Sequence, residues 1–373
     1  MQAEKNHWLV VVNVFAASRK AGSVWKRAAA MMEAAGVPYK AKFTGGAFNA
    51  IEIASNACAA GYRKFVAVGG DGTVHDVLNG IAGYVSEAGS GATFSDFTLG
   101  VVPLGSGNDW VKSTGVPKDL QKAVDIIAAG HTGHQDVVKV SVLDPSDLQT
   151  TVGDSYMVNV GGVGLDARVC EIVNRKKERG YRGKQLYVSA LLYCIRHRVP
   201  IRARILCDGV EVFSGKYLSI AFGVGKYSGG GMQQTPLAEL GDGLLDVTVI
   251  PDISLWTIAK EIPKLFTGKF HTVSVLTQSK CSQVLVLPYN DADADLVEVD
   301  GEVVGRAPVR MEVVPEHINV VDKVQEMFIR CIRISMRKDR TLAANKALLN
   351  ETIEKFEKDQ KYSDHITINV DPA

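Results

Sequence analysis

Residues 69–80 read GGDGTVHDVLNG and follow directly on an apolar run, Phe65–Val68. This order predicts a buried strand, a glycine-rich turn and the start of a helix. Backbone N–H groups in such a turn, with the positive end of the helix dipole, favour a phosphate group. Asp71 stands beside them, and a carboxylate next to phosphates calls for a metal ion in between. The turn therefore indicates a polyphosphate site with Mg²⁺, and the alternative is an ordinary αβ turn in which Asp71 caps the helix.

A second glycine turn follows the apolar run Leu99–Pro103 and reads LGSGNDW, residues 104–110. Its polar groups are the Ser106 hydroxyl, the Asn108 amide and the Asp109 carboxylate. Two such turns at the carboxyl ends of strands in one sheet face the same crevice, which is the usual ligand position in open α/β sheets. The alternative is that Asn108 and Asp109 only cap the next helix.

The first part of the chain alternates between strand and helix. Trp8–Phe15 is a nearly continuous apolar run, which is typical of a strand in a parallel sheet buried on both faces. The other predicted elements are the helices Ser23–Ala35, Asn49–Ala60 and Val74–Ile81 and the strands Ala41–Phe43, Phe65–Val68 and Leu99–Pro103. This alternation predicts an open, mostly parallel α/β domain over residues 1–133.

The pattern changes near Asp136 to short strands separated by turn residues. The predicted strands are Val137–Val142, Tyr156–Val160, Ile201–Leu206, Lys216–Phe222, Leu245–Ile250, Thr272–Leu276, Gln283–Leu287, Leu296–Val299 and Val309–Val314. Gln185–Arg196 is the clear helix among them. Residues 134–317 therefore predict a larger antiparallel β domain, sandwich-like or barrel-like. C-terminal helices are expected after it, with residues 341–373 as a helical extension.

Composition narrows the class of protein. The 373 residues are 46% hydrophobic and carry a formal net charge of +1, which excludes a nucleic-acid binder that acts through overall charge. The six cysteines lie far apart without a CxxC pair, as in a chain with reduced thiols. Neither a secretory signal nor an apolar run of membrane-spanning length is found, so we expect a cytoplasmic protein.

The two glycine turns together resemble the catalytic domain of the diacylglycerol kinase and sphingosine kinase family, in the layout of the bacterial soluble lipid kinases. Further matches follow in the family's order: NVGGVGLDAR (159–168), GGGMQQTP (229–236), GDGLLD (241–246) and VDGE (299–302). The resemblance covers residues 8 to 320. It implies a nucleotide-binding domain over residues 1–133, joined by a segment of about 318–340 that returns to it, and a lipid-binding domain over residues 134–317.

The resemblance also implies which residues bind ATP and Mg²⁺. The matching nucleotide-contact positions are Asn13, Thr44, Gly69, Gly70, Asp71, Gly72, Thr73, Gly105, Ser106, Asn108 and Asp109. One position departs from the family pattern, since Asn13 is followed by Val14 where the family usually has proline. In GDGLLD, the Asp242 side chain and the carbonyls of Glu239 and Leu244 are expected to hold a structural Mg²⁺. The alternative there is a turn in which Asp242 accepts hydrogen bonds from nearby backbone N–H groups.

The VDGE segment suggests the catalytic base. Phosphorylating an alcohol needs a group that accepts the hydroxyl proton, and in the family this turn supplies it. We therefore expect Asp300 or Glu302 as the base, without ranking them, and Asp71 as an organiser of magnesium or phosphates. From the residues alone, Asp300-Gly301 is also an ordinary hairpin turn.

Residues 175–204 hold ten basic side chains and one acid, on either side of the apolar LYVSALLYCI (186–195). Basic flanks around an apolar helix with aromatic side chains predict peripheral contact with an anionic membrane surface. The alternative is a core helix whose flanking arginines are solvated.

Taken together, the sequence predicts an ATP-dependent lipid kinase. It would transfer the γ-phosphate in line to the hydroxyl of diacylglycerol, a sphingoid base or a glycolipid, at the inner face of the membrane. No nucleic-acid partner is expected, and a homodimer is compatible with the sequence. The alternatives are a small-molecule kinase resembling the NAD kinases and a non-catalytic lipid or nucleotide sensor.

Overall fold

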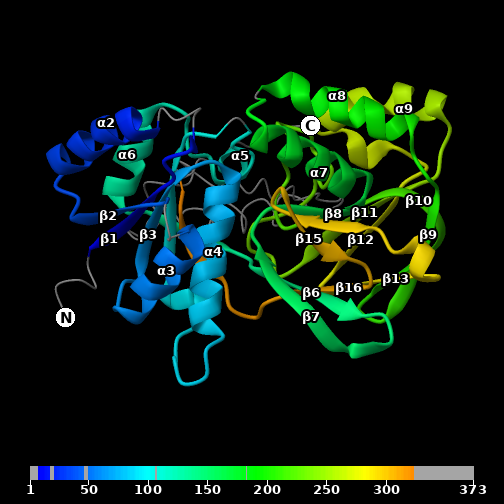
Figure 1. The fold of residues 1–373 in the computed structure, drawn as a ribbon, viewed down its shortest axis with the longest axis horizontal. Coiled ribbons are helices and arrows are strands. Elements are labelled where there is room, and N and C mark those ends of the chain that lie inside the picture. Colours follow the sequence, from blue (N-terminus) through cyan, green and yellow to red (C-terminus); the bar gives the residue numbers. More distant parts are fainter. Residues whose placement is uncertain (1–6, 17–20, 46–48, 106, 182, 323–373) are drawn as a thin grey trace, which may run out of the picture. The chain divides into compact units, whose positions relative to one another are not determined.

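The structure is a computed structural model that describes residues 7–16, 21–45, 49–105, 107–181 and 183–322 (Figure 1). The expected C-terminal helices, including residues 341–373, and the returning segment beyond residue 322 lie outside the described residues.

Among the described residues, the first sheet has six strands in the order β2-β1-β3-β4-β17-β5. These are β1 (Trp8–Val12), β2 (Tyr39–Phe43), β3 (Lys64–Gly69), β4 (Thr98–Pro103), β5 (Thr132–Gln135) and β17 (Ile318–Val321). Its helices are α2 (Ala21–Ala34), α3 (Ala50–Ala59), α4 (Asp71–Val85), α5 (Trp110–Thr114) and α6 (Leu120–Ala129), with the 3₁₀ turn η1 (Phe94–Asp96). Neighbouring strands run parallel except β5, which is antiparallel to β17. The mostly parallel α/β architecture expected from the sequence is confirmed.

Strand β1 illustrates how this sheet is buried on both faces. Leu9 and Val11 belong to a core with α3 and α4. Val10 and Val12 belong to a separate core with α2 and α6. Helices α3 and α4 touch closely at Gly80, where any side chain would collide with the backbone and side chains of α3. The apolar run at the start of the chain is therefore continuous because successive side chains enter different cores.

The second sheet is antiparallel, as expected, and has eleven strands among the described residues. They are β6 (Val138–Asp144), β7 (Asp147–Met157), β8 (Val160–Gly164), β9 (Ile201–Cys207), β10 (Val210–Gly223), β11 (Leu245–Pro251), β12 (Thr277–Cys281), β13 (Gln283–Pro288), β14 (Leu296–Val299), β15 (Glu302–Arg306) and β16 (Val309–Val313). The sheet curls until its edge strand β15 lies over β6, where a Cβ on Gly305 would lie 2.9 Å from Val142. This curvature encloses one apolar core inside the sheet.

Three helices cover the second sheet, α7 (Leu165–Glu178), α8 (Lys184–Arg196) and α9 (Leu255–Glu261), and they share one apolar cluster (Figure 1). The short 3₁₀ helices are η2 (Ile262–Phe266), η3 (Phe270–Thr272) and η4 (Asp291–Asp293). Helix α7 was not predicted, although Leu165, Val169 and Val173 recur at four-residue spacing on its buried side. The strand expected over residues 272–276 is wrong: η3 ends there and β12 begins at Thr277. No helix of the described residues is both long and apolar enough to cross a membrane.

Candidate active site

The two glycine turns touch each other at the carboxyl ends of β3 and β4. A Cβ on Gly70 would lie 2.9 Å from the Cα of Gly105, and a Cβ on Gly105 would lie 2.6 Å from the Cα of Gly70. Asn108 adopts a left-handed conformation with φ of 49°, and its Oδ1 accepts a hydrogen bond of 2.8 Å from Gly105 N–H. Two residues without side chains are therefore needed at the point where the turns meet.

Asp71 lies between these turns and does not cap its own helix. The N-cap of α4 is Gly70, with no capping side-chain hydrogen bond. Asp71 Oδ1 instead accepts a hydrogen bond of 3.0 Å from Trp110 N–H in the second turn. A Cβ on Gly107 would lie 3.1 Å from Asp71 Oδ2 and 3.2 Å from Asp109 Oδ2, so both carboxylates approach the same residue. Burial first, and then the charge of Asp109, raise the pKa of Asp71 to about 6.

Asp109 ties the second turn to a loop of the second sheet. Its Oδ1 is bonded to Lys112 Nζ, and its Oδ2 accepts a hydrogen bond of 2.6 Å from Gly230 N–H. The Lys112 ammonium also lies 5.8 Å from the ring centre of Tyr227. Asp109 is thus engaged on both oxygens, and its place in the site is that of a positioning residue.

Asn13 and Thr73 connect the end of β1 to the first glycine turn. Asn13 Nδ2 donates a hydrogen bond of 3.1 Å to Thr73 Oγ1, and Asn13 Oδ1 accepts one of 3.0 Å from Phe15 N–H. Any Cβ on Gly69 would collide with the Thr73 hydroxyl. The asparagine therefore keeps a structural place in the site although the proline of the family pattern is missing.

Thr44 follows β2 at the same edge of the sheet. Its N–H donates to Val12 O at 2.9 Å, and its Oγ1 is buried without a hydrogen-bond partner among the described residues. An unpaired buried hydroxyl is costly and marks a place for a polar ligand atom or a water. Ser106, the remaining expected nucleotide contact, lies outside the described residues.

Asp300 is held by three donors. Its Oδ1 accepts from Asn159 N–H at 3.0 Å, and its Oδ2 accepts from Val158 N–H at 3.1 Å and faces His75 Nδ1 at 3.3 Å. The side chain is buried and the residue has φ of 51°. Asp300 thus joins the start of β8 to α4, and its geometry is that of an anchor for the turn.

The side chain of Glu302, in the same VDGE turn as Asp300, points toward the first glycine turn. Its Oε1 lies 3.1 Å from the position of a Cβ on Gly72, directly over the first turn of α4. Asn174 Nδ2 in α7 donates to Glu302 Oε2 at 3.3 Å and to Gly301 O at 2.9 Å. The structure thus brings the exposed Glu302 carboxylate to the glycine turn around Asp71, although the two segments are far apart in the sequence.

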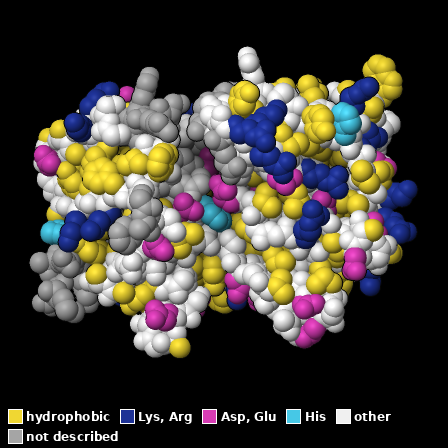
Figure 2. Space-filling model, viewed as in Figure 1, with side chains coloured by type: hydrophobic (Ala, Val, Ile, Leu, Met, Phe, Trp, Pro, Cys, Tyr) yellow, Lys and Arg dark blue, Asp and Glu magenta, His cyan; other side chains and the backbone are white. Residues whose placement is uncertain are grey.

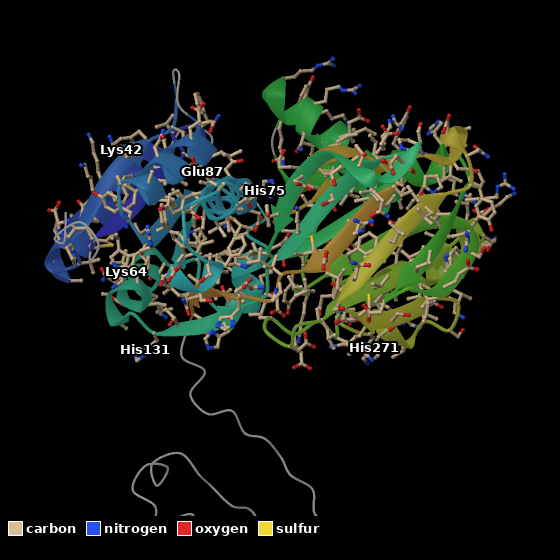
Figure 3. The ribbon with its side chains drawn as sticks, turned by 90° about the horizontal axis from the view of Figure 1, so that it is seen from below. Lys42, Lys64, His75, Glu87, His131 and His271 are labelled. Atoms are coloured by element: carbon tan, nitrogen blue, oxygen red, sulfur yellow. The ribbon has the colours of Figure 1, made fainter. Side chains whose placement is uncertain are left out.

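His75 and Asp76 belong to the same cluster, and sequence reasoning missed both. Burial would lower the pKa of His75, but the hydrogen bond to Asp300 and the charges of Asp300, Asp76 and Glu302 raise it overall. The pKa of Asp76 is raised to about 6, chiefly by burial. Figure 3 shows His75 where α4 meets the second sheet. A signal existed, because one helical turn separates His75 from Asp71 and puts both on one side of α4.

The expected metal turn around Asp242 does not fit a divalent cation as it stands. Asp242 Oδ1 accepts a hydrogen bond of 3.1 Å from Leu244 N–H, and Oδ2 lies 2.9 Å from Lys280 Nζ. An ammonium group thus stands where a bound cation would be. The described residues contain no group of three or more His, Cys, Asp or Glu side chains able to hold a metal ion. A site at Asp71 with fewer than three such side chains is compatible with Mg²⁺, because Mg²⁺ is usually held by one or two carboxylates together with substrate phosphates.

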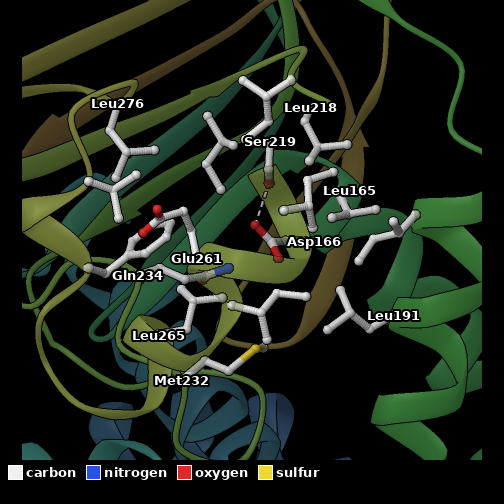
Figure 4. Close-up of a pocket in the computed structure, with 17 residues that line it drawn as sticks. Leu165, Asp166, Leu191, Leu218, Ser219, Met232, Gln234, Glu261, Leu265 and Leu276 are labelled. Atoms are coloured by element: carbon white, nitrogen blue, oxygen red, sulfur yellow. Dashed lines mark hydrogen bonds between the residues drawn. The ribbon is translucent and has the colours of Figure 1, made fainter. Parts of the chain in front are cut away.

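An apolar cavity with a free volume of about 50 Å³ lies between α7, α8, α9 and the second sheet. Its walls include Leu191, Leu218 and Phe270. Figure 4 shows the Asp166 carboxylate among these side chains, bonded to the Ser219 hydroxyl. Burial raises the pKa of Asp166. Helix α7 begins at this cavity and reaches the VDGE turn one and two helical turns later, through Cys170 and then Asn174.

The first sheet supplies two touching glycine turns and the second sheet supplies carboxylates beside them, an arrangement that suits an enzyme acting on phosphate groups. Residues 7–140 match the family model of the diacylglycerol kinase catalytic domain. Residues 159–322 match that of the YegS C-terminal NAD kinase beta sandwich-like domain. The chain thus carries a diacylglycerol kinase catalytic domain over residues 7–140, followed by a YegS-like C-terminal domain over residues 159–322.

Known proteins resemble the chain over most of its length. A diacylglycerol kinase of Mycobacterium tuberculosis is 27% identical over 278 residues, which is 74% of this chain and 82% of the relative. One of Bacillus subtilis is 25% identical over 292 residues, 78% of this chain and 87% of the relative. The crystal structure of a diacylglycerol kinase from Bacillus anthracis superposes with a TM-score of 0.65 at 20% identity, covering 86% of this chain and 98% of the other. At this identity, the likeness to the Bacillus anthracis structure shows a shared fold.

Proposed function

We propose that the chain is an ATP-dependent lipid kinase that transfers the γ-phosphate of ATP to a lipid hydroxyl. The observation that carries the proposal is the position of the Glu302 carboxylate over Gly72, at the start of α4. A proton acceptor is thereby close to the helix N-terminus and glycine turns that suit phosphate groups. The names of the relatives support a lipid as the acceptor, with diacylglycerol as the first candidate.

In the proposed reaction, the lipid hydroxyl oxygen attacks the γ-phosphorus in line. Its proton passes to Glu302 as the new O–P bond forms, and the bond from the γ-phosphorus to the bridging oxygen breaks to release ADP. Asp71 would hold the Mg²⁺ that neutralises charge on the phosphates. Asp109, through Gly230 N–H, and Asp300, which faces His75 Nδ1, connect the two sides of the site, while Asn174 holds the turn that carries Glu302.

The apolar cavity supports a lipid acceptor. Its walls are mostly aliphatic, as in apolar ligand sites. A hydrocarbon chain would gain from burial there. Asp166 offers one polar contact inside it, close to Glu298 in β14, since a Cβ on Gly162 would approach both side chains. We therefore infer that the hydrocarbon part of the substrate enters between α7, α8 and α9.

Contact with an anionic membrane surface would supply this substrate. Helix α8 exposes Val188, Leu192 and Tyr193, and α9 exposes Leu255 and Trp256, the last with 86% of its surface accessible. Exposed apolar side chains gathered on neighbouring helices are unusual unless they bind a partner or a membrane. Lys and Arg side chains gather over α7 close by (Figure 2). We propose that this surface lies on the inner face of the membrane.

The test of the proposed function is incubation of the purified protein with labelled ATP, Mg²⁺ and a total lipid extract. We expect label to enter an organic-soluble lipid, and purified diacylglycerol to serve as acceptor. Label in NAD or another water-soluble acceptor, with none in lipid, would favour the small-molecule kinase. The absence of any turnover in a protein that binds ATP would favour the sensor.

A further inference from the structure

The side chain of Lys280 places a positive charge at the turn of residues 239–246. Lys280 Nζ lies 2.9 Å from Asp242 Oδ2 and 3.3 Å from Asp246 Oδ2. The second oxygen of Asp242 accepts a hydrogen bond from Leu244 N–H within the same turn. The lysine side chain is about one-third exposed and the two carboxylates less so. One ammonium group therefore bridges both acids of the GDGLLD segment.

The position of this lysine is set by strand pairing. Lys280 in β12 is the direct register partner of Asp246 in β11, in the antiparallel ladder that runs from Leu245 opposite Cys281 to Val249 opposite Thr277. Directly opposed residues in such a ladder bring their side chains together. The pairing of β12 with β11 therefore places the Lys280 amine beside the turn.

The turn also holds the connection between the two sheets. Asp136 stands between β5 and β6, its Oδ2 accepts from Gly243 N–H at 2.8 Å, and its N–H donates to Leu240 O at 2.6 Å. Asp136, Asp242 and Asp246 together place three carboxylates beside this connection, where a nearby positive charge favours their ionised form. A structural cation here would serve to hold the crossing from one sheet to the other.

We propose that the Lys280 ammonium replaces a divalent cation at this turn, so that the turn binds no Mg²⁺. Mg²⁺ requires near-octahedral oxygen ligands at about 2.0–2.1 Å, and both side-chain oxygens of Asp242 are engaged, one by the ammonium and one by Leu244 N–H. A dication and an ammonium at the same two carboxylates would also repel each other strongly. The connection between the sheets is therefore held without metal, and the Mg²⁺ requirement of the chain is that of the nucleotide.

The test is Mn²⁺ binding followed by electron paramagnetic resonance without nucleotide, in the wild type, in Lys280→Met and in the double variant Lys280→Met/Asp242→Asn. Methionine keeps the length of the aliphatic stem at a partly exposed position, so the variant should fold. We expect Lys280→Met to gain one site that is at least tenfold tighter than anything the wild type binds at the turn, and the double variant to lose it. In parallel, EDTA should leave the melting temperature of the wild type unchanged, while Mg²⁺ should raise that of Lys280→Met.

The single variant Asp242→Asn is the control for Mn²⁺ bound elsewhere, including at Asp71. A wild-type site that Asp242→Asn abolishes would overturn the proposal, because the turn would then bind metal beside the lysine. Failure of Lys280→Met to gain a site would overturn it equally, since the turn would have no affinity for a cation for the lysine to replace. Neither outcome depends on kinase activity, so the proposed function is tested separately.

Discussion

Single carboxylates differ in what they contribute to the site, and at Asp71 the fold opposes the negative charge. Its pKa is raised to about 6 because it is buried and close to Asp109. A carboxyl with a raised pKa binds its proton more tightly in the folded chain, so its contribution to stability is lost as the pH rises from about 4 to about 6. At neutral pH the ionised group therefore costs stability, and such a cost is expected at a group kept for function.

Asp71→Asn is expected to lower the kinase activity on the order of a hundredfold or more. The melting temperature of the variant at pH 7.5 should not fall below that of the wild type. Asparagine keeps the oxygen that accepts from Trp110 N–H and removes the buried charge. The difference in melting temperature from the wild type should shrink at pH 5, where the wild-type carboxyl is protonated. Asp125→Asn, on the exposed side of α6, is the matched control. Retained turnover in Asp71→Asn would remove Asp71 from the mechanism.

The base can be identified by comparing Glu302→Gln with Asp300→Asn. Glu302 is exposed, so glutamine should lower kcat by about 10²–10⁴-fold with little change in melting temperature. Asp300 accepts two backbone N–H groups, so asparagine should lower the melting temperature clearly as well as the activity. Steady-state kinetics and thermal unfolding of both variants decide the matter. A stable, inactive Asp300→Asn beside an active Glu302→Gln would assign the base to Asp300.

At the scale of elements, α7 links the lipid cavity to the catalytic turn. Leu165 and Asp166 line the cavity at its start, and Cys170 and Asn174 bind Gly301 O further along. In the proposed reaction, the helix would therefore couple the position of the hydrocarbon chain to that of Glu302. Helix α7 was not predicted from the sequence, because the second half of the helix is rich in charged residues and its apolar spacing is short.

Asn174→Ala tests this coupling. Loss of the hydrogen bonds to Gly301 O and Glu302 Oε2 should cost about 1 kcal/mol, or ~5-fold in kcat, with the KM for ATP unchanged. Glu171→Ala on the exposed side of the same helix serves as the control. A change confined to the melting temperature, with kcat preserved, would reduce Asn174 to a structural role.

At the scale of the whole molecule, the exposed apolar side chains of α8 and α9 should determine membrane binding. Trp256→Ala is expected to weaken co-sedimentation with anionic vesicles on the order of tenfold, because a large apolar side chain is then no longer buried in lipid. Binding of the wild type should fall with added salt, since basic groups contribute. Val152→Ala, at an apolar position in β7 that is 61% exposed, is the control. Equal losses in both variants would argue against a defined membrane surface.

The local sequence predicted those parts that depend on neighbouring residues. The apolar runs of the first sheet, the two glycine turns and the antiparallel strands after Asp136 follow from side-chain periodicity and from where only glycine fits. His75 lay inside the most informative motif and was still missed, because its partner Asp300 is far away in the chain. The same holds for Asn174, whose role exists only through Gly301 and Glu302.

The sequence by itself determined the fold class and the two turns, because these depend on the spacing of residue types along the chain. Its resemblance to a known family supplied the other candidate carboxylates, Asp242, Asp300 and Glu302. Only the tertiary structure decided what each carboxylate does. It separated Asp300, bound by backbone N–H groups, from Glu302, which reaches Gly72. It also put Lys280 on Asp242, where a metal ion was expected. Burial, charge and hydrogen-bond partners come from segments that meet only after folding, and no local pattern encodes which segments those are.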